Sequence, residues 1–339
     1  YSDSINSSSK PEVTSRNLYP PRVADLCSKF NLLHSYGWEE SEIPSKWVKD
    51  FNTYLSGITV MSSQVKKILI DNGVLIPIKV TGLGLDHFDN INADHAFKIN
   101  AKKYRILHIS SCFPRKGIDI LLKSYEKVFT SDDDVTLIIK TFDNPHNNIE
   151  NILIEARKLN INFPDVVILK DDLNLEQLKS LYLQCNVLVA PSRGEGFGLP
   201  IGEAMKLGVP VITTNWGGQL DFCDEQNSWL IDFKFTKSES HFNLDNSYWA
   251  EPSCENLAKI LKSVYSAPQS LIQLKTNLAK EKAKLMSWDY MARENRLFVE
   301  NDLHLLNNEF SKFGLVTTWS SRCGIASYSK HLLDHSIQN

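Results

Sequence analysis

The stretch Ser192-Arg-Gly-Glu-Gly-Phe-Gly-Leu-Pro-Ile-Gly-Glu-Ala-Met205 decides how the middle of this chain folds. It follows the apolar run at 187–191, which predicts a buried strand. It leads into a predicted helix that has Pro200 in its first turn and Gly208 at its end, the positions that proline and glycine favour. The pattern therefore predicts a strand, a glycine-rich loop and a helix in direct succession, which is the order of elements that repeats in a parallel α/β sheet.

Three glycines and two carboxylates indicate what this loop can bind. Gly194, Gly196 and Gly198 let the backbone approach a ligand closely, and the amides and dipole of the following helix favour an anion. Glu195 lies in the loop and Glu203 in the predicted first turn of the helix. A carboxylate accepts two hydrogen bonds, so each suits a vicinal diol of a sugar. The combination predicts a site for a sugar–diphosphate–nucleoside; the simpler alternative is a glycine-rich turn capped by acids.

Similar strand patterns recur on both sides of the loop. Short runs of Val, Ile and Leu are typical of strands buried on both faces of a parallel sheet. They occur at 105–110, 135–140, 166–169, 187–191, 209–213 and 228–232, with amphipathic helical stretches between most of them. Six strands with helical crossovers, followed by helices that Pro268 interrupts, predict a complete Rossmann-like domain over residues 99–310.

Residues 1–98 show the same alternation over only part of their length. Residues 1–20 are polar and predict a loop or a disordered lead-in. The remainder predicts about two strands, with helices that include one capped by Ser62 and Ser63; these elements fall at 45–55, 57–61, 63–73 and 77–81. Two strands are too few for an independent doubly wound sheet. The segment therefore predicts the C-terminal half of a second Rossmann-like domain, with a linker at 87–103.

Residues 311–339 resemble the beginning of a further unit. They predict a strand at 314–319, a loop at 320–324 and a helix at 325–333. A new strand, loop and helix after a finished domain indicates that another module starts here. Together with the start at Tyr1, this predicts that the chain is a piece of a longer, tandem enzyme.

Composition excludes several classes of protein. Of the 339 residues, 42% are hydrophobic and 23% charged, and the net charge is -3, which argues against a dedicated nucleic-acid binder. The six cysteines are scattered, so neither a zinc site nor a disulfide framework is expected. No apolar run approaches the roughly 20 residues of a membrane span, and no signal peptide is visible. We expect a cytoplasmic protein without a metal.

A second candidate site is Ser110-Ser-Cys-Phe-Pro-Arg-Lys-Gly117, which follows the first strand of the complete domain. Arg115 and Lys116 lie in a strand-to-helix loop, where positive charge can hold a diphosphate; the alternative is an exposed basic turn. The loop at 213–218 also follows a strand on the ligand side of the sheet. Thr214 is therefore a candidate contact for the sugar–diphosphate–nucleoside, although a plain turn explains this loop equally well.

The stretch 192–205 resembles the E-x7-E signature of family 4 glycosyltransferases, with Glu195 and Glu203 as its two acids. The resemblance extends over roughly residues 30–300 and implies a GT-B fold, in which two Rossmann-like domains face a cleft. It implies transfer of a sugar from a nucleotide donor with retention of configuration and without a catalytic metal.

The resemblance also implies roles for individual residues. Glu203 would bind the ribose hydroxyls, Glu195 the donor sugar and Lys116 the diphosphate. The loop backbone would lie beside the sugar and diphosphate, at Gly196, Phe197, Gly198 and Leu199. The family usually has an arginine where this chain has Ser111, which puts a two-base clamp in doubt, although Arg115 could take its place.

The resemblance places the acceptor in the other domain. The stretch 34–42 is similar to part of that domain, although its aromatic residues are also typical of packing. The family often has a histidine near the donor sugar; His34 and His87 are candidates, but we expect it outside this chain.

We therefore expect a hexosyltransferase that acts on a glycan or glycolipid acceptor in polysaccharide or lipopolysaccharide biosynthesis, with Glu195 and Lys116 as catalytic residues. Two alternatives stay open: a nucleotide-sugar-binding module without turnover, and a hydrolase or epimerase of the same fold. Peripheral association with the inner membrane face is also open. A nicotinamide oxidoreductase is disfavoured because no G-x-G-x-x-G follows the strand at 105–110.

Overall fold

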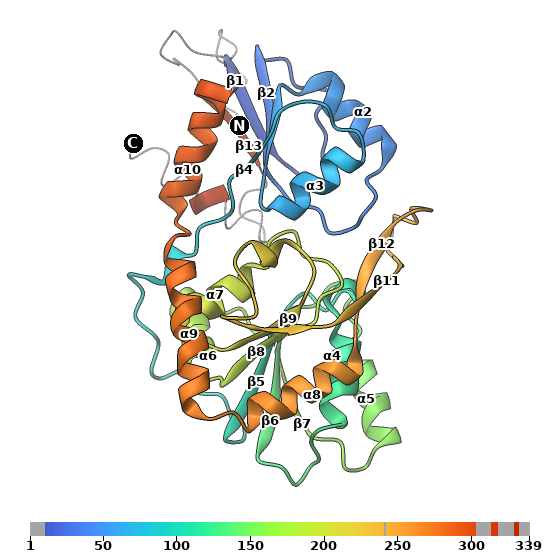
Figure 1. Ribbon diagram of the computed structural model, residues 1–339, viewed down its shortest axis with the longest axis vertical. Coiled ribbons are helices and arrows are strands. Elements are labelled where there is room, and N and C mark those ends of the chain that lie inside the picture. Colours follow the sequence, from blue (N-terminus) through green and yellow to red (C-terminus); the bar gives the residue numbers. More distant parts are fainter. Residues whose placement is uncertain (1–10, 241, 303–312, 318–328, 332–339) are drawn as a thin grey trace. The chain divides into compact units, whose positions relative to one another are not determined.

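The computed structural model describes residues 11–240, 242–302, 313–317 and 329–331, which form two compact units (Figure 1). The first unit takes its residues from 1–38, 42–84 and 286–339, and the second consists of residues 39–41 and 85–285. Among the residues described, no helix combines the length and the apolar character needed to cross a membrane.

The second unit is built on a six-stranded sheet in the order β10-β9-β8-β5-β6-β7, and all its strand pairs are parallel. The six predicted strands are thereby confirmed; they are β5 (Tyr104–Ile109), β6 (Val135–Lys140), β7 (Asp165–Leu169), β8 (Val187–Ala190), β9 (Val211–Thr214) and β10 (Trp229–Ile231). From β5 the chain proceeds outward through β6 and β7, and from β8 it proceeds the other way. The strand order therefore reverses between β5 and β8, which is where open α/β sheets bind their ligands.

Both faces of this sheet are covered. Ile106, Leu137 and Val189 belong to an apolar cluster that includes side chains of α4 (Ile118–Glu126), α5 (Ile149–Leu159) and α8 (Cys254–Tyr265). Leu107, Ile138 and Leu188 alternate with them along the strands and are completely buried too. Since successive side chains of a strand point to opposite faces, the second face is also packed. The remaining helices of the unit are α6 (Leu175–Leu183), α7 (Leu199–Leu207) and α9 (Gln269–Lys284), and α7 packs against the other two.

An antiparallel hairpin that the sequence patterns do not predict extends from this unit (Figure 1). Its strands are β11 (Phe233–Lys237) and β12 (Tyr248–Pro252), paired from Phe233 with Pro252 to Lys237 with Tyr248. The loop end of the hairpin is held by Glu40, whose carboxylate accepts hydrogen bonds from Ser238 and Ser247, both at 2.8 Å. These contacts join residues about 200 positions apart, so a local pattern gives no indication of them.

The first unit contains a five-stranded parallel sheet in the order β13-β1-β2-β3-β4. Its strands are β1 (Val13–Asn17), β2 (Phe30–Tyr36), β3 (Gly57–Val60), β4 (Ile78–Val80) and β13 (Phe313–Thr317), and its helices are α2 (Ser45–Tyr54), α3 (Ser63–Asp71) and α10 (Trp288–Leu297). The predicted cap of α3 is confirmed, because Ser62 accepts a hydrogen bond from the Val65 amide.

The prediction of a loop over residues 1–20 is wrong for 13–17; residues 1–10 lie outside the described part. The strand β1 is polar in sequence but buried, because tertiary partners satisfy its side chains. Arg16 pairs with Asp25, and Ser15 hydrogen-bonds His34 Nδ1 at 2.8 Å. Buried polar groups of this kind are stable only when they are paired, which the local sequence does not reveal.

The division between the units differs from the predicted boundaries at 98/99 and 310/311. The chain leaves the first unit after Gly84 and re-enters it at Met286. The helix α10 belongs to the first unit, where Asn295 Oδ1 accepts a 2.6 Å hydrogen bond from Thr59. Strand β13 pairs with β1 there, from Val13 with Phe313 onward. That residues 311–339 begin another module stays a prediction; most of the predicted loop and helix lies outside the described residues.

His34 makes the first unit sensitive to acid. Burial lowers the pKa of His34 to about 3, so the folded unit keeps it neutral while the unfolded chain binds a proton below about pH 6.5. The free energy of unfolding should therefore fall by about 1.4 kcal/mol per pH unit below 6.5 on account of this group. Urea unfolding at pH 7 and pH 5 measures the loss. His34→Gln should reduce it, whereas His95→Gln, at an exposed site, should leave it unchanged.

Candidate functional site

The loops after β5 and β8 meet at the point where the strand order reverses. They contain the two stretches predicted to bind a ligand, 110–117 and 192–198, and lie at the carboxyl ends of neighbouring strands. The topology therefore brings together side chains that are 79 residues apart in sequence.

Lys116 and Glu195 form an ion pair at this point. Lys116 Nζ lies 2.6 Å from Glu195 Oε1, which also accepts a 2.7 Å hydrogen bond from Ser192. Burial opposes the charge of Glu195, but Lys116 and Arg115 outweigh it and hold the pKa of this carboxyl below its usual range. Burial, with Arg115, lowers the pKa of Lys116. The two predicted catalytic residues are thus partners in one largely buried ion pair.

Close backbone approach explains two of the glycines. A Cβ at Gly117 would lie 1.9 Å from the Pro191 carbonyl oxygen, and one at Gly194 would lie 2.3 Å from the Glu39 carbonyl oxygen. Gly198, with φ +89°, is the N-cap of α7, so the first amides of this helix lie directly after the glycine loop. Within the first turn, Pro200 has no N–H and the Ile201 amide donates to the Gly198 carbonyl at 2.9 Å. The Leu199 amide therefore remains as the helix N–H that an anion at this N-terminus could use.

Gly117→Ala should destabilise the second unit by more than backbone strain alone. Gly82 supplies the matched control, because its φ is also +67° but no atom lies within 4 Å of an added Cβ. Gly82→Ala should cost about 1–2 kcal/mol, the price of a left-handed alanine. Gly117→Ala should exceed this, because the loops after β5 and β8 must separate. Urea unfolding of both variants tests the difference; equal costs would show that the close approach is unimportant.

Arg115 is engaged within the protein. Its guanidinium lies 3.2 Å from Glu39 Oε1 and donates to the Gly194 carbonyl at 3.2 Å, while its own carbonyl accepts from the Arg193 amide at 2.7 Å. Arg115 therefore joins the two loops. Its predicted contact with a diphosphate would require its guanidinium to turn from Glu39, and that role stays a prediction. Ser111 contributes its carbonyl to Asn144 at 2.9 Å, which anchors the loop after β6.

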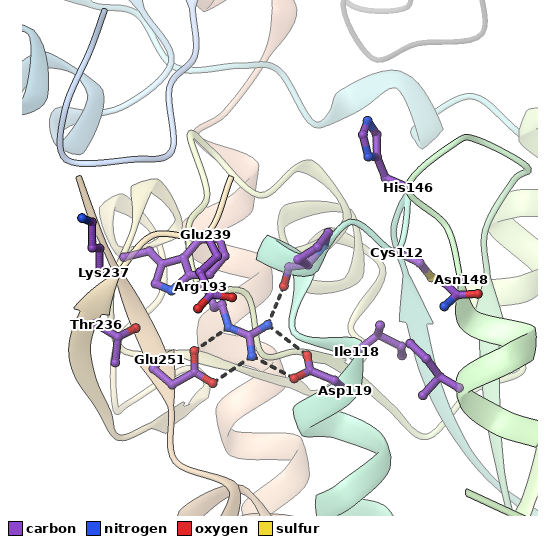
Figure 2. Close-up of a pocket in the computed structure, with 13 residues that line it drawn as sticks. Cys112, Ile118, Asp119, His146, Asn148, Arg193, Thr236, Lys237, Glu239 and Glu251 are labelled. Carbon is purple, nitrogen blue, oxygen red and sulfur yellow. Dashed lines mark hydrogen bonds and ion pairs between the residues drawn. The ribbon is translucent and has the colours of Figure 1, made fainter. Parts of the chain in front are cut away.

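Arg193, which the sequence does not single out, is the most connected side chain of the site (Figure 2). Its Nε and Nη2 donate to Glu251 at 2.5 and 2.8 Å, and its Nη1 and Nη2 donate to Asp119 at 2.9 Å each. Nη1 also donates to the Pro114 carbonyl at 2.5 Å, and the guanidinium lies over Trp249. Arginine has five N–H groups, so all are used. Arg193 thereby ties the glycine loop to α4 and to the hairpin.

A pocket of about 630 Å³ lies beside this network (Figure 2). Asp119 and Glu251 line it on either side of Arg193, while Thr236 comes from the hairpin and His146 from the loop after β6. Asp119 and Glu251 form ion pairs with Arg193, and an ionised carboxylate only accepts hydrogen bonds, so these two side chains offer acceptors to the pocket.

Arg193→Met should destabilise the second unit by about 3 kcal/mol or more, because it leaves two partly buried carboxylates without their partner. Asp119 gives a pH signature: burial alone would raise its pKa, but Arg193 holds it below the usual range. The stabilisation should therefore be present at neutral pH and be lost below about pH 4.

Urea unfolding of wild type and Arg193→Met at pH 7 and pH 3 measures both effects. Lys158→Met, which removes an exposed ion pair with Glu155, is the control and should cost at most about 1 kcal/mol. A cost as small for Arg193→Met would contradict the structural role of the network.

Glu203 lies past the first turn of α7, contrary to the prediction, because the helix begins at Leu199. Its carboxylate is buried between two side chains: His87 Nε2 lies 3.0 Å from Oε1, and the Tyr182 hydroxyl donates to Oε2 at 2.5 Å. His87 is therefore a partner of Glu203. The sequence patterns did not indicate Tyr182, because a tyrosine on the buried face of α6 looks like a packing residue. Both neighbours of Glu203 come from segments that are distant from it in sequence.

Thr214 and Gln219 complete the buried polar groups near the loop. Gln219 Nε2 donates to the carbonyls of Thr214 and Trp216, at 3.0 and 2.9 Å. Among the described residues, Thr214 Oγ1 and Gln219 Oε1 are buried without a hydrogen-bond partner. Buried polar atoms are normally paired, so these two oxygens could bond a ligand. These residues adjoin the glycine loop, because the Gly218 amide donates to the Glu195 carbonyl at 2.7 Å.

His34, the other candidate histidine, lies in β2 of the first unit. In the loop after β7, Lys170 pairs with Asp143 and Glu150, at 2.8 and 2.9 Å.

The fold and this site define a class of protein. Solved structures with the same fold include the glycosyltransferase of Rickettsia africae (TM-score 0.61, 20% identity, 82% of this chain and 71% of that chain). Another is Anabaena Alr3699/HepE in complex with UDP and glucose (TM-score 0.62, 18% identity, 82% and 72%). The chain thus has a fold of the GT-B type.

Residues 89–262, just over half of the chain, match the family described as Glycosyl transferases group 1. The chain belongs to this family.

Two curated relatives match parts of the chain. The O-antigen biosynthesis glycosyltransferase WclY of Escherichia coli is 36% identical over 103 residues, which are 30% of this chain and 26% of the relative. The capsular polysaccharide biosynthesis glycosyltransferase CapM of Staphylococcus aureus is 28% identical over 176 residues, 48% of this chain and 44% of the relative. The chain thus spans less than half the length of these two relatives.

Proposed function

We propose that this chain contains the donor site of a retaining glycosyltransferase. In this proposal the enzyme transfers a hexosyl group from a nucleoside-diphosphate sugar to a glycan or glycolipid acceptor during polysaccharide biosynthesis. The observation that carries the proposal is the Lys116–Glu195 pair beside the N-terminus of α7, the same helix that carries Glu203. A cation beside the N–H groups of the glycine loop suits a diphosphate, and the two carboxylates suit the hydroxyls of a sugar and of a ribose.

Each part of the donor has a partner in this arrangement. The diphosphate would be held by Lys116 and by the amides of residues 196–199. These groups would stabilise the negative charge that develops on the leaving diphosphate. Glu195, released from Lys116, would accept hydroxyl groups of the sugar. Glu203 would accept the ribose hydroxyls. The neutralisation is assigned to these groups, so the proposal requires no metal ion.

The relatives support the choice of substrates. HepE was solved in complex with UDP and glucose, so UDP is the first nucleotide to test. WclY and CapM are glycosyltransferases of O-antigen and capsular polysaccharide biosynthesis, which favours a glycan acceptor.

Isothermal titration with UDP, GDP and ADP tests the donor site. We expect one nucleotide to bind with micromolar affinity, and Lys116→Ala to weaken it by about tenfold or more, since a charge-assisted hydrogen bond to a diphosphate contributes about 1.5–3 kcal/mol. Glu203→Ala should weaken it by a similar factor. Glu155→Ala, at an exposed helix position, is the control and should have no effect.

Failure of a folded sample to bind any of the three nucleotides would reject the donor site. With the matching nucleotide sugar, release of a free or epimerised sugar in place of a glycoside would favour a hydrolase or epimerase.

A further inference from the structure

The carboxylate of Glu203 is held in one orientation by two side chains from different elements. Glu203 is on α7, Tyr182 on α6 and His87 in the short 3₁₀ helix Asp86–Phe88. The contacts are 2.5 Å from the Tyr182 hydroxyl to Oε2 and 3.0 Å from His87 Nε2 to Oε1. The side chains of Glu203 and His87 are only 9% and 5% exposed, so water can contribute little to their orientation.

Close packing around Gly202 brings these groups together. A Cβ at Gly202 would lie 2.8 Å from the Leu85 side chain, so the glycine lets the segment before the 3₁₀ helix lie directly against α7. The Phe88 ring then packs edge-on against the Tyr182 ring, with centroids 6.2 Å apart. The position of His87 next to Glu203 is therefore set by apolar packing on both sides.

Hydrogen-bond capacity shows what the carboxylate can still do. Each oxygen of an ionised carboxylate has two lone-pair sites. His87 takes one site on Oε1 and Tyr182 takes one on Oε2. One site on each oxygen is left, which matches the two hydroxyls of a vicinal diol. A carboxylate free to rotate would present the same atoms without a fixed direction.

The direction of the Tyr182 hydrogen bond is determined. Burial, reinforced by the Glu203 carboxylate, raises the pKa of Tyr182 well above its ordinary value. The phenol therefore keeps its proton and donates a hydrogen bond to Oε2.

We propose that Tyr182 and His87 are positioning residues that orient Glu203 to receive both ribose hydroxyls, and that they make the site selective for ribonucleotides over 2′-deoxyribonucleotides. The proposal rests on the donor site proposed above, and it concerns residues that would not touch the transferred sugar or the diphosphate. Loss of a positioning residue should therefore reduce selectivity at the ribose and leave the rest of donor binding in place.

The test compares two ligands in each variant. The wild type is titrated with whichever of UDP, GDP and ADP it binds and with the 2′-deoxy form of that nucleotide. We expect the ribonucleotide to bind about tenfold more tightly, the effect of losing one hydrogen bond to a charged group. In Tyr182→Phe this ratio should fall to about threefold or less, with the affinity for the deoxynucleotide within about twofold of wild type.

Two further comparisons separate positioning from stability. His87→Gln keeps an N–H donor that can reach the carboxylate and should retain more of the ratio than His87→Leu. Tyr125→Phe is the matched control, because Tyr125 is an equally buried tyrosine whose hydroxyl bonds the carbonyls of Val135 and Asp165. It should lower stability without changing the ratio.

Three outcomes would overturn the positioning role of Tyr182 and His87. A Tyr182→Phe protein that binds the ribonucleotide with the full wild-type ratio would overturn the positioning role while leaving the donor site intact. A wild type that binds both forms equally would also overturn it. Absence of all nucleotide binding by the folded wild type would reject the donor site itself, and this inference with it.

Discussion

The hydrogen bonds of the Arg193 guanidinium are the interaction on which the arrangement of the loops after β5 and β8 depends. Arg193 lies in the glycine loop after β8, and its five N–H groups bond Asp119 of α4, Glu251 of β12 and the Pro114 carbonyl. Its backbone continues the same connections, because its amide donates to Arg115 and its carbonyl accepts from Ala250. Two parts of the chain that are distant in sequence, the loop after β5 with α4 and the hairpin, are thus joined at the glycine loop, two residues from Glu195.

The two acidic residues of the loop and helix are held in different ways. Glu195 faces Lys116, a cation that can exchange its partner when an anion arrives. Glu203 faces a phenol and an imidazole, and its two described hydrogen bonds come from these groups. In the proposed function this contrast suits their tasks: the first acid belongs to a charged group that must rearrange on binding, and the second to a rigid acceptor for hydroxyls.

Local patterns predicted the regular part of the fold well. The six strands of the second unit were predicted because strands buried on both faces must be apolar along their whole length, and α7 because proline and glycine mark its ends. The same reasoning missed β1, whose Thr14 to Asn17 are polar and buried through distant partners. It also missed the hairpin, which Glu40 anchors from far away in sequence, and it did not indicate that β13 pairs with β1.

The sequence by itself determined the class of fold and the residue types of the site, because strand periodicity, glycine positions and the spacing of Glu195 and Glu203 are local properties. Only the tertiary structure decided which side chains meet. That Lys116 pairs with Glu195, that Arg193 is fully bonded, and that Tyr182 and His87 hold Glu203 are consequences of strand order and helix packing. Hydrogen bonds and ion pairs act over about 3 Å in space, and no local sequence pattern indicates which distant residues come within that distance.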